Sequence, residues 1–276
     1  MNRLFVSGDL HANECGELKY IITKKFFPQL PRLDKEDLLI QLGDFAGLWY
    51  YENYKEGRIL DMKFCEKIAS QNYTMLVIPG NHENYDLINS LPSVSKWNGS
   101  VYVLETRKGN IYFAKRGEIY NFADKSFFTF SGAESSDIDS RNNLNEIGLK
   151  KRVINTRGRK VIRKIKLSQV NHWSQEIFNE EERLFALDNL SKCNYKVDYI
   201  FTHTVSRNII PEVISLTNDR DLIKYNDPVA NFLNEVNDLV EFKEWHFGHF
   251  HTNAKIIKNK ELYRSHYMNS PMEINH

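Results

Sequence analysis

Seven side chains with oxygen or nitrogen donors lie directly behind short β-type runs, and four of them immediately follow a glycine. They are Asp9, His11, Asp44, Asn81, His203, His249 and His251. Glycine lets the backbone turn sharply where a strand ends, and open α/β sheets bind their ligands in the loops at the carboxyl ends of strands. The pattern therefore predicts that these side chains meet in one crevice.

This donor set mixes carboxylate, amide and imidazole groups and contains no thiolate. Such a mixture favours borderline ions, Mn²⁺ first and Fe or Zn²⁺ as alternatives, over Ca²⁺. Seven protein ligands exceed the needs of one ion, so they divide into two sites that share a bridging carboxylate. Two ions about 3.5–4 Å apart can clamp the attacking and leaving oxygens of a displacement at phosphorus, with a bound hydroxide as the nucleophile. The prediction is a metal-dependent hydrolase of a phosphomonoester or phosphodiester.

Five motifs occur in a fixed order over nearly the whole chain. They are Gly8-Asp9-Leu10-His11, Gly43-Asp44-Phe45-Ala46-Gly47, Gly80-Asn81-His82-Glu83, the lone His203 and Gly248-His249-Phe250-His251. The series resembles the calcineurin-like metallophosphoesterase superfamily. The resemblance implies a four-layer α/β/β/α sandwich and a dinuclear metal centre.

The resemblance also implies a role for each position. Asp9, His11 and His251 would hold the first ion and Asn81, His203 and His249 the second, while Asp44 would bridge the two. His82 would not be a ligand, since the family uses this histidine to stabilise the transition state or to protonate the leaving oxygen. Glu83 could orient His82.

Two weaker motifs in the middle of the chain resemble a bacterial and phage branch of the superfamily whose natural substrates are largely unassigned. They are Gly132-Ala133-Glu134-Ser135-Ser136-Asp137 with Arg141, and His172-Trp173-Ser174-Gln175-Glu176. The Asp-Arg pair of the family's protein phosphatases is replaced here by Gly47 and Leu48. Protein phosphatase activity is therefore less expected, and Arg141 could supply a bidentate guanidinium to the phosphoryl group instead.

Alternation of strand and helix patterns predicts an α/β fold. Strands are expected over residues 3–7, 37–42, 73–78, 197–202 and 244–247, and helices after the N-caps Asn179 and Asp227. Four further short runs predict a β meander, namely Val101–Leu104, Ile111–Ala114, Glu118–Phe122 and Ser126–Ser131. We expect one domain over residues 1–276 with a basic insert at about 142–167.

With 276 residues, 41% of them hydrophobic, the chain can bury a substantial core, which excludes a disordered chain, a collagen and a disulfide miniprotein. No apolar run approaches the roughly 18 residues of a membrane-spanning helix, and no apolar leader precedes the first predicted strand. Cys15, Cys65 and Cys193 are odd in number and far apart. A soluble protein of the reducing cytoplasm is expected.

The net charge of +1 conceals a strong asymmetry. Nine cations and no acid lie between Leu149 and Leu167, and without them 28 Lys and Arg face 36 Asp and Glu, a net charge of −8. The insert is either a solvated excursion or a two-stranded ribbon around Arg157-Gly158-Arg159 that draws nucleic acid or a nucleotide to the active site. The alternatives to a general phosphoesterase are therefore a nuclease or cyclic-nucleotide phosphodiesterase and, from another class, a catalytically idle nucleic-acid-binding or interaction module.

Overall fold

The structure is a computed structural model of the chain. It describes residues 2–11, 18–48, 55–135, 149–156, 159–166, 173–217, 226–267 and 270–274. For residues 55–57, 149–156 and 159–166 the description covers the backbone.

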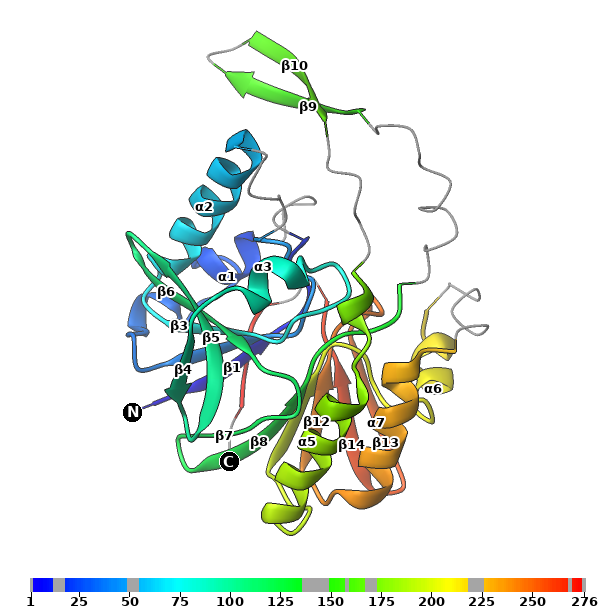
Figure 1. Ribbon diagram of the computed structural model, residues 1–276. Coiled ribbons are helices and arrows are strands. Elements are labelled where there is room, and N and C mark those ends of the chain that lie inside the picture. Colours follow the sequence, from blue (N-terminus) through cyan, green and yellow to red (C-terminus); the bar gives the residue numbers. More distant parts are fainter. Residues whose placement is uncertain are drawn as a thin grey trace.

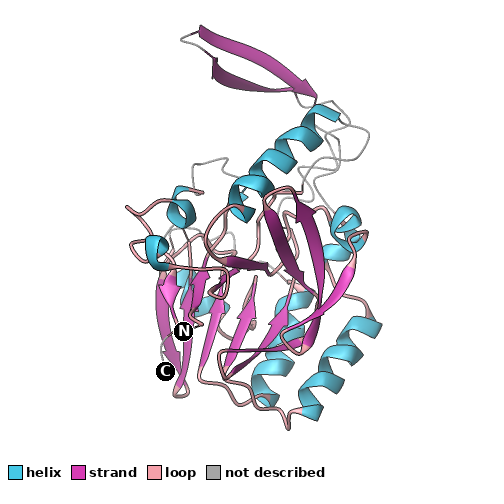
Figure 2. Cartoon of the chain, turned by 90° about the vertical axis from the view of Figure 1, so that its left-hand side faces the viewer, coloured by secondary structure: helices cyan, strands magenta, loops and turns pink. Residues whose placement is uncertain are grey.

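Two β-sheets pack face to face, and helices cover the outer face of each sheet (Figures 1 and 2). In spatial order the first sheet contains β15 (Met272–Glu273), β1 (Leu4–Ser7), β2 (Leu38–Gln41), β3 (Thr74–Val77), β6 (Gly109–Ala114), β5 (Gly99–Thr106) and β4 (Ser93–Lys96). The second contains β13 (Ala254–Lys258), β14 (Glu261–Ser265), β12 (Glu244–Phe247), β11 (Tyr199–Thr202), β8 (Lys125–Phe130) and β7 (Ile119–Phe122). The predicted four-layer α/β/β/α fold is confirmed.

Alternate residues of the central strands face opposite layers of the molecule. In β1, Leu4 and Val6 belong to the core between the two sheets, while Phe5 belongs to the core beneath the outer helices. In β11, Phe201 faces the other sheet and Ile200 faces the helices. Because both faces are buried, these strands appear in the sequence as continuous hydrophobic runs.

The helices divide between the two outer layers. On the first sheet lie α1 (Lys19–Ile22), α2 (Lys55–Ala69) and α3 (Tyr85–Asn89), and on the second α5 (Glu180–Lys192), α6 (Ile210–Ser215) and α7 (Pro228–Leu239). Short 3-10 turns occur at Leu30–Arg32 and Ser174–Glu176. Among the described helices, none combines the length and the apolarity needed to cross a membrane.

The motif-bearing strands are parallel within their sheets. β1, β2 and β3 run parallel to one another, and so do β11 and β12. Hydrogen bonds join the loops at their carboxyl ends, from the backbone nitrogen of His11 to the Asp44 oxygen and from Gly248 to His203. The loops that carry the predicted ligands therefore meet at one edge of the molecule, as the motif positions indicate.

The four β-like runs over residues 101–131 do not form one meander, so that prediction is wrong. β5 and β6 are an antiparallel pair in the first sheet, whereas β7 and β8 pair in the second. The chain crosses between the sheets near Gly117, which has a φ of +80° and lies against Ala186 of α5. Strand propensity marks each run but not the sheet to which it belongs.

The predicted ribbon is present as a separate antiparallel pair, β9 (Leu149–Thr156) and β10 (Arg159–Lys166). The pair stands away from the two sheets in both views (Figures 1 and 2). Residues 157 and 158, where the turn is expected, lie outside the described residues.

Both predicted helix starts are confirmed. Asn179 and Glu182 form a reciprocal capping box at the start of α5, and Asp227 accepts a hydrogen bond from the Val229 nitrogen at the start of α7.

We expect Asn179→Ala to lower the free energy of unfolding by about 1 kcal/mol, because the backbone nitrogen of Glu182 loses its side-chain acceptor. Urea denaturation followed by circular dichroism measures the change. Asn179→Asp keeps a capping oxygen and should retain most of the stability; equal losses in both variants would contradict the capping role.

Candidate metal centre

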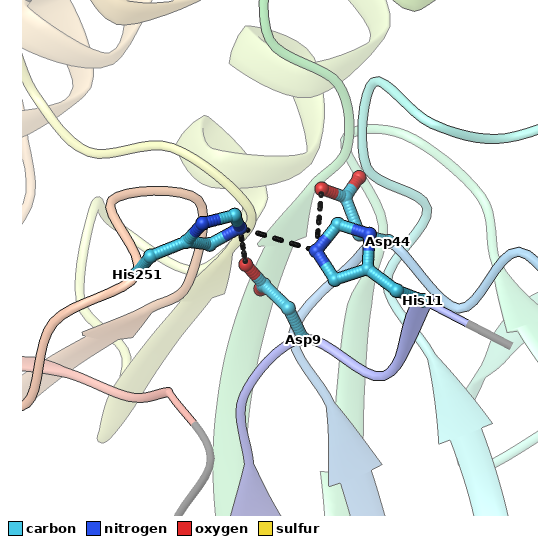
Figure 3. A group of neighbouring side chains, drawn as sticks. All are labelled: Asp9, His11, Asp44 and His251. Carbon is cyan, nitrogen blue, oxygen red and sulfur yellow. Dashed lines mark hydrogen bonds and ion pairs between the residues drawn. The ribbon is translucent and has the colours of Figure 1, made fainter. Parts of the chain in front are cut away.

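Four of the predicted ligands converge at the ends of β1, β2 and β12 (Figure 3). Each of Asp9, His11, Asp44 and His251 offers one ligand atom, and these atoms all lie within 4.8 Å of one another. His251 Nε2 is 3.4 Å from Asp9 Oδ2 and 3.1 Å from His11 Nε2, which is in turn 3.8 Å from Asp44 Oδ2. The spacing suits several ligands around one ion.

The polar atoms of this group fit a cation. Asp9 Oδ2 is buried and accepts no hydrogen bond from the described residues. The Nε2 atoms of His11 and His251 face each other, although two neutral imidazoles can satisfy such a contact only if one of them carries its proton there. A divalent ion would satisfy all three acceptor atoms, because neutral imidazole and carboxylate are both metal ligands.

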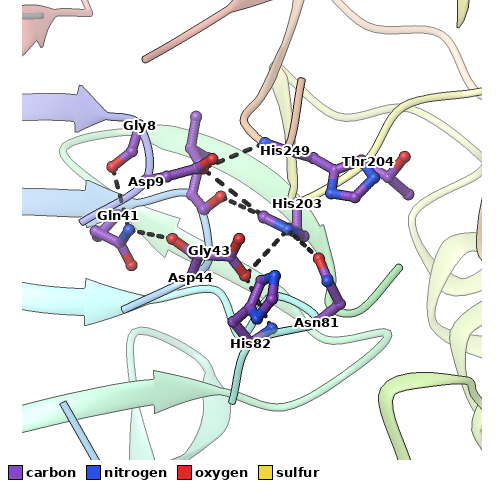
Figure 4. Close-up of polar contacts among 12 residues, drawn as sticks. Gly8, Asp9, Gln41, Gly43, Asp44, Asn81, His82, His203, Thr204 and His249 are labelled. Atoms are coloured by element: carbon purple, nitrogen blue, oxygen red, sulfur yellow. Dashed lines mark hydrogen bonds and ion pairs between the residues drawn. The ribbon is translucent and has the colours of Figure 1, made fainter. Parts of the chain in front are cut away.

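A second group of acceptor atoms lies on the other side of Asp44 (Figure 4). His203 Nδ1 is 2.8 Å from the Leu42 carbonyl oxygen, which can only accept, so Nδ1 carries a proton. In the neutral ring His203 Nε2 then presents its lone pair toward Asn81 Oδ1 at 2.9 Å and Asp44 Oδ1 at 3.3 Å. Three acceptor atoms that converge in this way also fit a cation.

His249 lies beside His203 on this side of the site. Its ring centroid is 4.9 Å from that of His203, and its backbone nitrogen donates to Asp9 Oδ1 at 3.2 Å. Desolvation by the surrounding protein, followed by the proximity of His203, holds the pKa of His249 well below its ordinary value. The ring is therefore neutral near pH 7, which is the form that binds metals.

Asp44 lies between the two groups, with Oδ2 toward His11 and Oδ1 toward His203. Burial alone would raise the pKa of Asp44, but electrostatic interactions with His203, His82 and His11 outweigh it and lower the pKa below its usual range. The ionised carboxylate thus offers one oxygen to each group, which is the geometry of a bridging ligand.

The ligand loops have strained backbones that the motifs do not reveal. His11, Asp44, His249 and His251 have φ values of 45°, 49°, 64° and 47°, in the left-handed region that non-glycine residues rarely adopt. Such conformations cost of order 1–3 kcal/mol each and persist where surrounding structure over-determines them. Here the inter-loop hydrogen bonds supply that support.

Gly43 is required by both its conformation and its surroundings. Its φ is +92°, and a Cβ atom at this position would lie 2.0 Å from His203 Nδ1. The glycine before Asp44 therefore allows His203 to approach the Asp44 carboxylate.

His82 lies beside the first ligand group. Its ring centroid is 5.7 Å from that of His11, and its backbone nitrogen donates to Asp44 Oδ1 at 3.0 Å. The side chain is partly exposed, so a substrate can reach it.

Glu83 is fully buried and accepts hydrogen bonds from the Phe45 and Ala46 nitrogens at 2.6 and 3.2 Å. These contacts assign Glu83 to the loop after Asp44, whereas the sequence suggested a role on His82.

Two supporting residues have no counterpart among the predicted site residues. Gln41 Nε2 donates to the carbonyl oxygens of Gly8 and Gly43 and so joins two ligand loops. A glutamine at the end of the hydrophobic run Leu38-Leu39-Ile40 is the signal that could have revealed it. Tyr267 stacks on His251 with ring centroids 4.4 Å apart, and no motif marks it. Arg141 lies outside the described residues.

A family model described as calcineurin-like phosphoesterase matches residues 3–207. The chain belongs to this family. Metallophosphoesterase membership confirms the predicted enzyme class, a hydrolase of phosphate esters. His249 and His251 lie beyond the matched residues, and the fold brings them to the same site.

Several known proteins resemble this metallophosphoesterase. An uncharacterized protein of Acanthamoeba polyphaga mimivirus is 26% identical over 219 residues, which cover 71% of this chain and 68% of that protein. The phosphopantetheinyl hydrolase of Mycobacterium tuberculosis matches 99% of this chain and 95% of its own at 13% identity and a TM-score of 0.45. A dimetal phosphatase from Danio rerio matches 98% of this chain and 88% of its own at 11% identity and a TM-score of 0.49.

We expect Gly43→Ala to weaken Mn²⁺ binding by about ten-fold or more, because the added methyl group would displace the candidate ligand His203. Isothermal titration calorimetry measures the affinity. Gly109→Ala is the control, since Gly109 also has a positive φ of 135° but lies at the start of β6. It should cost stability and leave metal binding intact. Unchanged Mn²⁺ affinity in folded Gly43→Ala would contradict the role of this glycine.

Proposed function

We propose that the protein hydrolyses phosphate esters at a dinuclear centre. Asp9, His11 and His251 would hold one divalent ion, and Asp44 would bridge it to the other. The second ion's remaining ligands would be Asn81, His203 and His249. The observation that carries this proposal is that the two oxygens of Asp44 face different groups of ligand atoms.

The bound ions would supply a water molecule of lowered pKa and would neutralise charge on the phosphoryl oxygens. Mn²⁺ is the expected metal, with Fe or Zn²⁺ as alternatives, because the ligands combine imidazoles with carboxylates. The buried protein atoms around the site exclude bulk water from one side of this charge, which strengthens electrostatic interactions with the substrate.

In this mechanism His82 donates a proton to the oxygen of the leaving group. Its backbone is fixed by Asp44, its ring lies at the edge of the ligand group, and it is partly exposed. An imidazole is suited to the task because its ordinary pKa lies near neutral pH. A guanidinium from Arg141 on the phosphoryl group stays a prediction.

The roles of Asp44 and His82 are separable. Asp44→Asn should lose metal and all activity, because the amide has one oxygen and no charge with which to bridge two ions. His82→Ala should retain the metal while kcat falls by about 10²- to 10⁴-fold through loss of the proton donor. Mn²⁺ content and turnover of an aryl phosphomonoester and an aryl phosphodiester measure both effects. Full turnover by either folded variant would remove that residue from the mechanism.

A second candidate function is cleavage of nucleic acid or of a cyclic nucleotide, and the ribbon of β9 and β10 favours it. Eight of the nine cations of the insert lie within these two strands. Arg152 is paired with Arg163, and Lys151 with Lys164, at successive register positions. Since successive positions of a strand belong to opposite faces, both faces of the ribbon contain cationic residues.

A ribbon of this kind suits a polyanion. The major groove of duplex DNA admits a two-stranded β-ribbon, and neutralisation of phosphates by Lys and Arg supplies most of the affinity of non-specific binding. The ribbon would then deliver long substrates to a centre that already acts on phosphate esters. The same residues would contribute little to a small substrate that occupies the metal centre alone.

Deletion of Val153–Lys166 tests this second candidate. We expect kcat/KM for double-stranded oligonucleotides to fall by about ten-fold or more, with a weaker dependence on salt, while turnover of an aryl phosphodiester stays unchanged. The double variant Arg152→Gln with Arg163→Gln serves as a milder change that keeps the ribbon length. If oligonucleotides and the aryl diester are affected equally, the ribbon has no role in substrate selection.

A further inference from the structure

Two buried residues border the basic insert and contact each other. Ser135 lies between the end of β8 and the basic insert, and Glu176 ends the 3-10 turn at Ser174–Glu176 that follows the insert. The backbone nitrogen of Ser135 donates to Glu176 Oε1 at 3.0 Å, and Ser135 Oγ donates to Oε2 at 3.0 Å. One carboxylate thus joins the two chain segments at the base of the insert.

Ser135 also contacts a candidate metal ligand. Asn81 Nδ2 lies 3.1 Å from Ser135 Oγ. A hydroxyl group has a single proton, and the proton of Ser135 is directed to the Glu176 carboxylate, which accepts only. Ser135 Oγ must therefore accept the hydrogen bond from Asn81. The amide nitrogen of Asn81 is held on this side, and its Oδ1 faces His203 Nε2 at 2.9 Å.

This arrangement matters because the two ends of an amide have nearly the same shape. Packing alone does not distinguish Asn81 from its flipped form, so only hydrogen bonds select between them. A flipped amide would present an NH₂ group to the second ligand group. A nitrogen that carries two protons repels a cation, whereas the carbonyl oxygen binds it.

We propose that Ser135 and Glu176 are positioning residues that fix the amide orientation of Asn81 so that Oδ1 serves as a ligand to the second ion. This inference rests on the dinuclear centre proposed above. It also assigns a role to the two weaker motifs in the middle of the chain, since Ser135 of one and Glu176 of the other contact each other beside Asn81. The base of the basic insert is thereby connected to the second ion's ligands through one hydroxyl group.

Two variants test the proposal in different ways. Ser135→Ala removes the acceptor for Asn81 Nδ2. Glu176→Gln keeps the size of the side chain but changes its protons: its Oε1 can still accept from the Ser135 nitrogen, so its NH₂ group faces Ser135 Oγ. The hydroxyl proton is then free to bond Asn81 Oδ1, and the flipped amide is no longer disfavoured.

Ser126→Ala is the matched control. Ser126 donates to Asp198 Oδ2 from its backbone nitrogen at 2.8 Å and from its Oγ at 3.1 Å, so it makes the same pair of bonds to one carboxylate. It lies near the start of β8, at the end of the strand opposite to the Ser135 side. Its loss should affect stability without affecting metal binding.

Mn²⁺ binding by calorimetry and by equilibrium dialysis gives the readout. We expect the wild-type protein to bind two ions, and Ser135→Ala and Glu176→Gln to bind the second about ten-fold or more weakly while the first is retained. Ser126→Ala should match the wild type. If Ser135→Ala does not fold, as judged by circular dichroism, the isosteric Glu176→Gln decides the question.

The outcomes separate this inference from the proposed function. Wild-type affinity for both ions in the folded variants would overturn the role of Ser135 and Glu176 and leave the dinuclear centre intact. A wild-type protein that does not bind two ions would overturn the dinuclear centre and this inference with it. Selective loss of the second ion, absent from Ser126→Ala, supports both.

Discussion

A single buried carboxylate, that of Asp44, faces candidate ligands from both sheets. The rest of the structure must hold these side chains around it. His11 comes from the first sheet and His203 from the second, so the two sheets must present the carboxyl ends of their strands at the same edge. The parallel order of β1, β2 and β3, and of β11 and β12, produces this arrangement. The hydrophobic core between the sheets fixes their separation, and that separation determines whether one carboxylate can reach both groups.

Confining so many polar groups to a small volume requires support from the surrounding backbone. Four candidate ligands have left-handed φ values, and Gly43 allows an approach that a methyl group would prevent. Gln41 donates to backbone carbonyl groups of the ligand loops, and Glu83 accepts from their backbone nitrogens. The free energy of the hydrophobic layers therefore offsets strain and desolvation concentrated at one edge of the molecule.

The convergence of the candidate ligands was predictable because each of them follows a strand whose hydrophobic run is visible in the sequence. The starts of α5 and α7 were predictable for a similar reason, since Asn179 and Asp227 act within one helical turn. Contacts between residues that lie far apart in the sequence were not predictable. Tyr267 stacks on His251 from 16 positions away, and Ser135 meets Glu176 across 41, with no periodicity to connect either pair. The assignment of β5–β8 to two sheets depends on the crossing near Gly117, which propensity does not encode.

The strands at the edges of the sheets differ in length and in charge, and the charge of the ribbon has a second effect at such an edge. β15 is a two-residue strand, and β4 and β13 contain lysines, so edge-to-edge pairing with another molecule is discouraged at these borders of the two main sheets. β9 and β10 are eight residues long, and in a two-stranded sheet each has one open backbone edge. Dense Lys and Arg residues on such strands repel a second copy of the same strands. The charge that would suit the ribbon to a polyanion would thus also oppose pairing between the ribbons of two copies of the protein.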